Sequence, residues 1–353
     1  MDRRNFLKRL FAIAAFLAVG GLGWFKLGRP AWSPVPVQPD SGPAGGVEAE
    51  QPRTADGTGP LLSLFLLSDV HINPDLGGPS EHLKQSLDDV TKSFGSAVNG
   101  IIFTGDLADY GRETDYNELR SVLKRYKLPP IHANMGNHDY YDIWMDQSGG
   151  FNRDTMPNGK TDSMCRERFQ RFMGYMKPYN EAVINGYPVL LLSQECYVQE
   201  KPSVGEGAWY SDEQLAWFKQ KMAEYGGKKP VFVMIHQPLP PKGQDGGNHT
   251  LIRAKAFREI LKPYPDVFVF SGHNHRDFIY TEDHYVKETF HWFHNSSVSR
   301  VLNRKYQLER PDSSQGLYVE VYADRVHLRG REFSTREWIA GAEWTVPLTS
   351  ATL

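Results

Sequence analysis

Cysteine is scarce in this chain, which has only Cys165 and Cys196 among its 353 residues. Neither lies in a CxxC pair or in the Cys/His spacing of a structural zinc site, so sites built on cysteine are excluded. The two thiols either form a single disulfide or stay free and buried, and the sequence leaves both alternatives open.

A large net charge is also absent, because 40 basic residues face 42 acidic ones and the formal charge is −2. This balance argues against a nucleic-acid partner held by bulk electrostatics. It does not exclude a small phosphorylated substrate, since bound metal ions would supply local positive charge. Internal repeats are missing as well, and the length allows one large domain or two ordinary ones.

The N-terminal residues have the pattern of an export signal. Arginines at 3 and 4 begin the stretch RRNFLK, and an apolar run from Leu10 to about Phe25 follows. The stretch resembles the twin-arginine consensus, although Asp2 stands where Ser or Thr is usual. We expect residues 1–28 to contact the export machinery or the membrane and to place the protein at the periplasmic or extracellular face. An ordinary N-terminal membrane anchor is the alternative.

Residues 29–60 are rich in proline, glycine and small side chains, which predicts a flexible linker. From residue 61, apolar runs of strand length alternate with helical patterns, and this alternation predicts an α/β layered fold over 61–335. After Gly272 the strands become shorter and more alternating, and residues 336–353 are interpreted as a C-terminal tail. We expect strands at 61–68, 100–104, 131–135, 188–193, 231–235, 266–270, 288–294, 316–321 and 325–328, and helices at 80–94, 113–127, 161–176, 211–225 and 250–261.

Five of the apolar runs are followed directly by side chains that bind metals. In open α/β sheets ligands bind at the carboxyl ends of the strands, so these groups are expected to converge. Together they could hold two divalent cations about 4 Å apart, the arrangement that cleaves phosphate esters. The motifs are Asp69-Val70-His71, Gly105-Asp106, Gly136-Asn137-His138-Asp139, His236 and Gly272-His273-Asn274-His275.

Individual residues in these motifs are suited to different tasks. The two oxygens of Asp106 could bridge two metals, and Asn137 offers a neutral oxygen ligand. His138 cannot easily share the metal of its neighbour, so it is free to act as a general acid. Asp109 could orient a histidine by accepting its ring N–H, or it could be a turn residue or helix cap.

The order D-x-H, G-D, G-N-H-D, H, G-H-x-H resembles that of the calcineurin-like metallophosphoesterase superfamily over residues 61–328. The resemblance implies a four-layer αββα sandwich, with two mixed β-sheets flanked by helices, and two divalent ions (Mn, Fe or Zn). It implies the following ligands: Asp69, His71, Asp106 and His275 for the first metal, and Asp106, Asn137, His236 and His273 for the second.

The resemblance also implies a mechanism, in which a metal-bridging hydroxide attacks phosphorus in line with the leaving oxygen. His138 would protonate the leaving group, with Asp109 as its orienting partner. Residues 105–111, with Tyr116, look most like the bacterial cyclic-nucleotide and glycerophosphodiester phosphodiesterase branch.

The sequence therefore predicts a dimetal-dependent phosphoesterase, with a phosphodiesterase preferred. A phosphomonoesterase or a lipid-headgroup pyrophosphatase of the same fold is the alternative. A binding module without turnover is disfavoured because no ligand is missing.

Four further features lie near these motifs. The long polar loop 146–162 has the length of a lid. Tyr141 either lines a substrate pocket or packs in the core, and packing is the commoner case. Arg276 follows the last motif and could meet a phosphate oxygen or face solvent. His249 is not expected to be a ligand.

Overall fold

The computed structural model describes residues 59–349. The expected signal at 1–28 and nearly all of the expected linker at 29–60 lie outside the described residues. Within residues 59–349, every helix is too short or too polar to cross a lipid bilayer.

Two six-stranded sheets form the centre of the described part. The first has the order β12-β11-β10-β1-β2-β3, in which β1, β2 and β3 are parallel and β10, β11 and β12 continue antiparallel from β1. The second has the order β4-β5-β6-β7-β9-β8, in which β5, β6, β7 and β9 are parallel and both edge strands are antiparallel. The bounds are β1 Leu62–Leu67, β2 Gly100–Thr104, β3 Ile131–Asn134, β4 Asn180–Ile184, β5 Tyr187–Leu191, β6 Val231–Met234, β7 Val267–Ser271, β8 Tyr285–Lys287, β9 His291–His294, β10 Gln315–Val321, β11 Arg325–Glu332 and β12 Glu337–Pro347.

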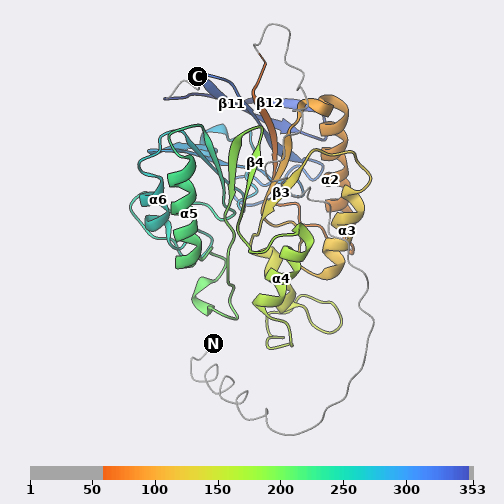
Figure 1. The fold of residues 1–353 in the computed structure, drawn as a ribbon. Helices are drawn as coiled ribbons and strands as arrows, with labels where there is room; N and C mark the ends of the chain where they lie inside the picture. The colour runs from red at the N-terminus through yellow and green to blue at the C-terminus, as the bar shows by residue number, and fades with distance from the viewer. Residues whose placement is uncertain (1–58, 350–353) are drawn as a thin grey trace, which may run out of the picture. The chain divides into compact units, whose positions relative to one another are not determined.

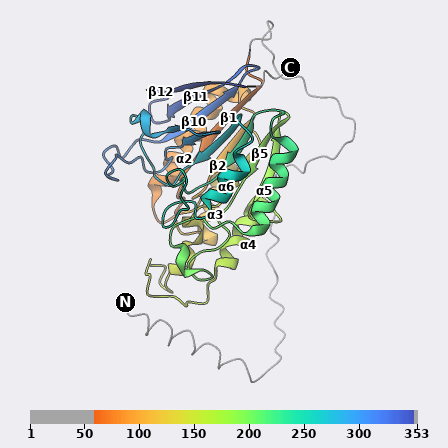
Figure 2. The same ribbon diagram turned by 90° about the vertical axis from the view of Figure 1, so that its left-hand side faces the viewer.

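Helices cover the outer faces of both sheets. Figure 1 shows α2 and α3 on one side of the strands and α5 and α6 on the opposite side, and Figure 2 shows the same arrangement from a second direction. The predicted four-layer αββα sandwich of two mixed β-sheets is thereby confirmed. The helices are α2 Gly77–Asp89, α3 Glu113–Leu123, α4 Asp162–Met173, α5 Asp212–Tyr225 and α6 Ala254–Leu261.

Local sequence explains where two of these helices begin and where one of them ends. The side chain of Thr161 accepts a hydrogen bond from the Met164 amide at the start of α4, and Gly174 ends that helix in the left-handed conformation. The side chain of Ser211 caps α5 in the same way by accepting from the Gln214 amide.

Burial explains the near-continuous apolar runs of the strands. Every residue of β1 is buried, as expected for a strand covered on both faces. In the second sheet, Phe232 and Met234 pack into the core shared with the first sheet, whereas Val231 and Val233 pack against α5 and α6. The sheets are therefore fixed relative to each other by a common apolar core, and this core holds their carboxyl edges in register.

The structure differs from the sequence expectations at several boundaries. Strands β4, β8 and β12 were not predicted, and the segment interpreted as a tail contributes β12, which pairs with β11 along most of its length. Helix α6 begins at Ala254 instead of 250, because Leu251 forms a bridge with Ala208. Cys165 and Cys196 are both free and buried, so the second cysteine alternative holds.

Candidate metal centre

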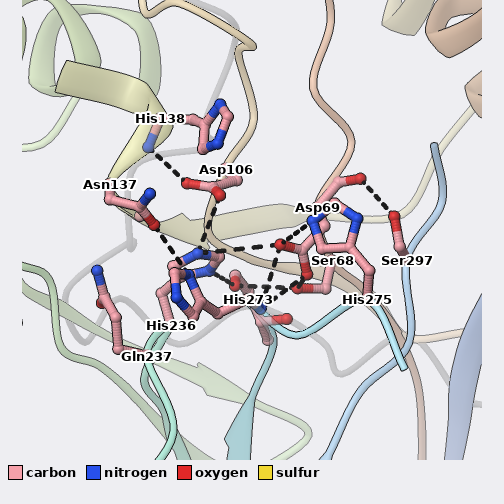
Figure 3. A network of polar contacts seen from close by, with 12 residues as sticks. Ser68, Asp69, Asp106, Asn137, His138, His236, Gln237, His273, His275 and Ser297 are labelled. Carbon is pink, nitrogen blue, oxygen red and sulfur yellow. Dashed lines mark hydrogen bonds and ion pairs between the residues drawn. The ribbon is translucent and has the colours of Figure 1, made fainter. Parts of the chain in front are cut away.

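All of the metal-binding motifs lie in loops that leave the carboxyl ends of parallel strands. Asp69 follows β1, Asp106 follows β2 and Asn137 follows β3, all in the first sheet. His236 follows β6 in the second sheet, and the two histidines of the last motif follow β7. Packing of the two sheets brings these edges together. Figure 3 shows six of the predicted ligands gathered around a shared space: Asp69, Asp106, Asn137, His236, His273 and His275. The seven predicted ligands are thus adjacent in the fold, although more than 200 residues separate the first from the last.

Five of these seven residues adopt a left-handed backbone conformation that non-glycine residues seldom use. Such conformations cost about 1–3 kcal/mol each and persist only where the surrounding structure enforces them, typically at functional sites. The strain indicates that the chain bends sharply where it leaves β1, β2 and β7 and so aims these side chains. The five residues and their φ angles are Asp69 (53°), His71 (48°), Asp106 (50°), His273 (73°) and His275 (52°).

Two glycines allow the loops to approach one another closely. A Cβ atom at Gly136 would lie 2.1 Å from Oδ1 of Asp106, and one at Gly272 would lie 2.5 Å from Oδ2 of Asp69. Any side chain at these positions would therefore displace a carboxylate of the site.

The first half of the metal centre consists of Asp69, His71 and His275, whose ligand atoms all lie within 4.8 Å of one another. Nε2 of His275 is 3.0 Å from Nε2 of His71 and 3.1 Å from Oδ1 of Asp69. Ligands about 2.1 Å from a common cation are separated by about 3 Å, so the spacing suits one bound ion.

The second half consists of Asn137, His236 and His273, together with Asp106. Nδ1 of His273 is 3.0 Å from Oδ1 of Asn137. Nε2 of His236 is 3.0 Å from Oδ2 of Asp106. The same Asp106 oxygen is 3.8 Å from Nε2 of His71 in the first half, so this carboxylate reaches both halves. Its position is that of a bridging ligand.

Hydrogen bonds at the far side of the rings fix which nitrogen faces the centre. Nδ1 of His275 lies 2.9 Å from the carbonyl oxygen of Arg300, and Nδ1 of His236 lies 2.8 Å from that of Thr104. Since a carbonyl only accepts, each Nδ1 carries a hydrogen and each neutral ring presents a lone pair at Nε2.

This arrangement of donors fits a pair of cations. The two Nε2 atoms of His71 and His275 face each other at 3.0 Å, which is unfavourable for two lone pairs and favourable for two ligands of one ion. Among the residues that the structure describes, the buried Nε2 of His236 has no hydrogen-bond partner, although an Asp106 oxygen is close by. Neutral imidazoles, carboxylates and an amide form a donor set of borderline softness that suits Mn²⁺, Fe²⁺ or Zn²⁺.

The pKa values of these histidines reflect the same environment. Burial lowers the pKa of His71 to about 3 and that of His273 to about 3, so both rings are neutral and can offer a lone pair. Burial would also lower the pKa of His236, but the negative charge of Asp106 outweighs it and raises the value to about 9. With this raised pKa, Nε2 of His236 would have to lose a proton before it could bind a cation.

The structure places His138 beside the metal centre but changes the role expected for Asp109. The carboxylate of Asp109 lies 3.2 Å from Nδ1 of His71 and accepts from the Asn73 amide at 3.1 Å. Its backbone carbonyl, in contrast, lies 2.9 Å from Nδ1 of His138, whose distance to the carboxylate is 3.6 Å. Asp109 therefore orients His138 mainly through its main chain, and its carboxylate serves the first half of the centre.

The charge of Asp109 is secured by its neighbours. Burial alone would raise the pKa of its carboxyl group, but the nearby imidazoles of His138 and His71 hold that pKa well below its usual range. The guanidinium group of Arg300 lies 3.4 Å from the same carboxylate and is half exposed. Arg300 was not identified from the sequence, because it follows no motif and reaches the site only through the fold.

Two other polar residues at the second half were also missed or set aside. Glu206 accepts a hydrogen bond from Nδ2 of Asn137 at 2.9 Å. Nδ1 of His249 lies 3.1 Å from Nε2 of His273, so His249 supports a ligand from behind without belonging to the ligand cluster. The only sequence signal for either residue is its position in a long polar loop.

The remaining candidates are placed as follows. The ring of Tyr141 is nearly buried and stacks on His138, with 4.0 Å between ring centroids. Arg276 is paired with Asp283 at 3.2 Å and lies over the ring of Tyr306, so its charge is engaged away from the metal ligands.

Two clusters of carboxylate and imidazole ligands that share one aspartate, at the carboxyl edges of an αββα sandwich, define a class of dinuclear metalloproteins. Within this class, the chain belongs to the calcineurin-like phosphoesterase family, whose sequence profile matches residues 62–277.

Curated relatives in this family are distant. The protein named glycerophosphodiester phosphodiesterase GpdQ from Enterobacter lignolyticus is 22% identical over 194 residues, which are 50% of this chain and 56% of the relative. The protein named "probable cyclic nucleotide phosphodiesterase" from Fibrobacter succinogenes is 26% identical over 186 residues, which are 50% of this chain and 57% of the relative. The chain thus spans little more than half the length of the curated relatives that it matches.

Solved structures confirm the fold. A dimetal phosphatase from Danio rerio superimposes with a TM-score of 0.56 at 14% identity and covers 82% of this chain and 99% of its own. The purple acid phosphatase PPD1 from yellow lupin superimposes with a TM-score of 0.52 at 11% identity and covers 81% of this chain and 53% of its own. At these identities the similarity establishes the architecture alone.

Proposed function

We propose that the protein is a metal-dependent phosphoester hydrolase that acts on phosphodiesters. The observation that carries the proposal is the convergence of two ligand clusters on Asp106, with His138 beside them. Membership of the calcineurin-like phosphoesterase family supports the hydrolase class. The names of the two curated relatives support the diester preference.

Two bound divalent ions, Mn²⁺, Fe²⁺ or Zn²⁺ by the donor set, would activate a water molecule and stabilise charge on the phosphoryl oxygens. Asp106 would hold the two halves of the centre at a fixed separation. Asp69, His71 and His275 would complete the first half, and Asn137, His236 and His273 the second. The nearly complete burial of Asp69, His71, Asp106 and His236 keeps bulk water away from the ligands.

His138 is the residue that we assign as general acid. Its Nδ1 is held by the Asp109 carbonyl, so Nε2 is the nitrogen that can carry a proton to a leaving oxygen. Its side chain is 22% exposed, in contrast to the buried metal ligands around it, so a substrate can reach it. Its backbone amide donates to Oδ1 of Asp106 at 2.9 Å, which ties the acid to the bridging ligand.

The test is a panel of bis-p-nitrophenyl phosphate, p-nitrophenyl phosphate and a diphosphate ester, assayed on the purified chain with metal analysis. We expect the diester to be cleaved fastest, activity to be lost on chelation, and activity to return with Mn²⁺, Fe²⁺ or Zn²⁺. Preference for the monoester would instead indicate a phosphomonoesterase, and preference for the diphosphate would indicate a pyrophosphatase. Full activity after metal removal would contradict the proposal as a whole.

We also propose export by the twin-arginine route, on the basis of residues 3–8. Replacement of both Arg3 and Arg4 by lysine should leave the protein in the cytoplasmic fraction, whereas the unchanged protein should be found outside it. Equal distribution of the two proteins would contradict export by this route.

A further inference from the structure

The carboxylate of Glu206 stands directly behind the second half of the metal centre. Glu206 follows the 3₁₀ helix Pro202–Val204, and its side chain is 13% exposed. It lies in no metal-binding motif and outside the ligand clusters. A carboxylate that is largely removed from solvent needs donors, and the identity of those donors shows what it does.

Each carboxylate oxygen of Glu206 accepts two hydrogen bonds. Oε2 accepts from Nδ2 of Asn137 at 2.9 Å and from the hydroxyl of Tyr141 at 2.9 Å. Oε1 accepts from the hydroxyl of Tyr197 at 2.8 Å and from a guanidinium nitrogen of Arg153 at 3.4 Å. Four donors satisfy the charge, so the carboxylate is held in one orientation.

The main chain of Glu206 is fixed as firmly as its side chain. Its amide N–H donates to Oδ1 of Asn248 at 2.8 Å, and its carbonyl accepts from Nε2 of Gln237 at 3.1 Å. Gln237 is the residue after the ligand His236. The position of Glu206 is thus tied to the same loop that leaves β6 and carries His236.

The contact with Asn137 decides which end of its amide faces the metal centre. A side-chain amide has one donor end and one accepting end, whereas a carboxylate can only accept. Glu206 therefore requires Nδ2 of Asn137 to face it, and Tyr141 accepts the second hydrogen of that nitrogen at 3.1 Å. Oδ1 is then directed to the opposite side, where it lies 3.0 Å from Nδ1 of His273.

We propose that Glu206 is a positioning residue for the second half of the metal centre and that it holds the amide of Asn137 with its oxygen toward the cation. This inference rests on the proposed function, in which Asn137 is a ligand of the second metal. Without the carboxylate, the amide could turn over and present its NH₂ group, which cannot bind a cation.

The same carboxylate also supports the proton donor. The hydroxyl of Tyr141 donates to Oε2 of Glu206, and its ring stacks on His138. One largely buried charge therefore stands behind both the amide ligand and the general acid. Glu206 contacts neither the reacting atoms nor the metal positions themselves, so it acts only through these two neighbours.

The test is a titration of the full-length, metal-free chain with Mn²⁺, followed by calorimetry and by electron paramagnetic resonance. The unchanged chain should bind two ions, and the spectrum should show two coupled manganese ions. Removal of a residue that hydrogen-bonds to a metal ligand typically lowers metal affinity about 10- to 100-fold. Glu206→Gln should therefore lower the affinity for the second ion by this amount. The first ion should bind as before, and the coupled signal should give way to that of isolated Mn²⁺.

Glu200→Gln is the matched control, because it makes the same chemical change six positions away on an exposed side chain that pairs with Arg166. It should leave both ions and the coupled signal unchanged. Glu206→Asp is a second variant, since it keeps the charge but withdraws the oxygens from Asn137. If Glu206→Gln does not fold, the affinity of Glu206→Asp for the second ion decides the outcome alone. A lower affinity supports the proposal, and an unchanged affinity overturns it.

A rescue experiment separates positioning from a general structural role. Asn137→Asp alone should weaken the second ion, because it places a carboxylate against Oε2 of Glu206. In combination with Glu206→Gln it should restore binding, since a carboxylate ligand needs no amide orientation and the new glutamine can donate to it. A double variant that binds no better than Glu206→Gln would overturn the proposal.

The result for the unchanged chain distinguishes the two proposals. Fewer than two bound Mn²⁺ ions in that chain would overturn the proposed function. Two bound ions in the unchanged chain, with equal affinity in Glu206→Gln and Glu206→Asp, would overturn the role of Glu206 and leave the proposed function standing.

Discussion

The two halves of the metal centre are held in place by different parts of the molecule. In the first half, Asp69 is anchored through its carbonyl by the hydroxyls of Ser297 and Ser299, and His275 by the carbonyl of Arg300. These partners all belong to one segment that packs along the first sheet.

In the second half, Asn137 and His273 instead depend on Glu206 and His249, which are side chains in two long loops. Ser297 and Ser299 are buried, whereas His249 is exposed, and contacts that solvent reaches are more easily displaced than buried ones. We therefore expect the first half to bind its ion more firmly than the second half.

The largest effect is expected from Asp106→Asn, which changes the ligand shared by both halves. The amide keeps the shape of the side chain but loses the charge and one accepting oxygen. The affinity for both ions should therefore fall by more than the roughly 100-fold that is the upper end for loss of a residue that hydrogen-bonds to a ligand. Activity should be abolished, while circular dichroism and the unfolding transition of the metal-free chain stay close to those of the unchanged protein. Loss of only one ion would show that Asp106 does not bridge.

A smaller effect is expected from His138→Ala, which removes the proton donor but no ligand. The turnover number should fall about 10²- to 10⁴-fold, the usual contribution of a general acid. Both metals should be retained in elemental analysis. If both metals were lost while the rate per bound metal pair stayed unchanged, the role assigned to His138 would be wrong.

Asp109→Asn should disturb the first half selectively. The new amide must place its NH₂ group against either His71 or Asn73, each of which already donates to this position. We expect the first ion to bind about 10- to 100-fold more weakly. A Mn²⁺ titration of this variant beside Glu206→Gln would show whether each half can lose affinity for its ion without the other. Identical titration curves would show that the two halves are not held independently.

The smallest effect is expected from His249→Ala. His249 is exposed, so water can take its place beside Nε2 of His273. We expect the affinity for the second ion to fall by less than about tenfold, which is at the low end for loss of a residue that hydrogen-bonds to a metal ligand. A larger loss would show that the loop contributes more to the second half than its exposure indicates.

The sequence allowed the fold to be predicted where the pattern was continuous. The buried parallel strands β1, β2, β6 and β7 were placed within one or two residues, because apolar runs of strand length leave little choice, and the edge strand β3 was placed equally well. Strands β4, β8 and β12 were not predicted, since these three edge strands are only partly buried and lack such runs.

The predicted ligands lie together in the structure because each stands immediately after a predicted strand, so that the position follows from the local pattern. The partners behind the ligands follow from no such pattern. Glu206, His249 and Arg300 come from loops whose course depends on how the two sheets pack. Asp109 contacts His71 through its carboxylate and His138 through its carbonyl. This arrangement depends on φ and ψ angles that the sequence does not reveal.

The sequence by itself determined the type of side chain at every strand end, and with it the kind of metal centre that the chain can form. Only the tertiary structure decided which groups stand behind those ligands and which way each ring and amide turns. The physical reason is that a ligand is specified by local chemistry at the end of a strand. Its orientation is specified by hydrogen bonds to atoms that are far away in the chain and meet only when the two sheets pack.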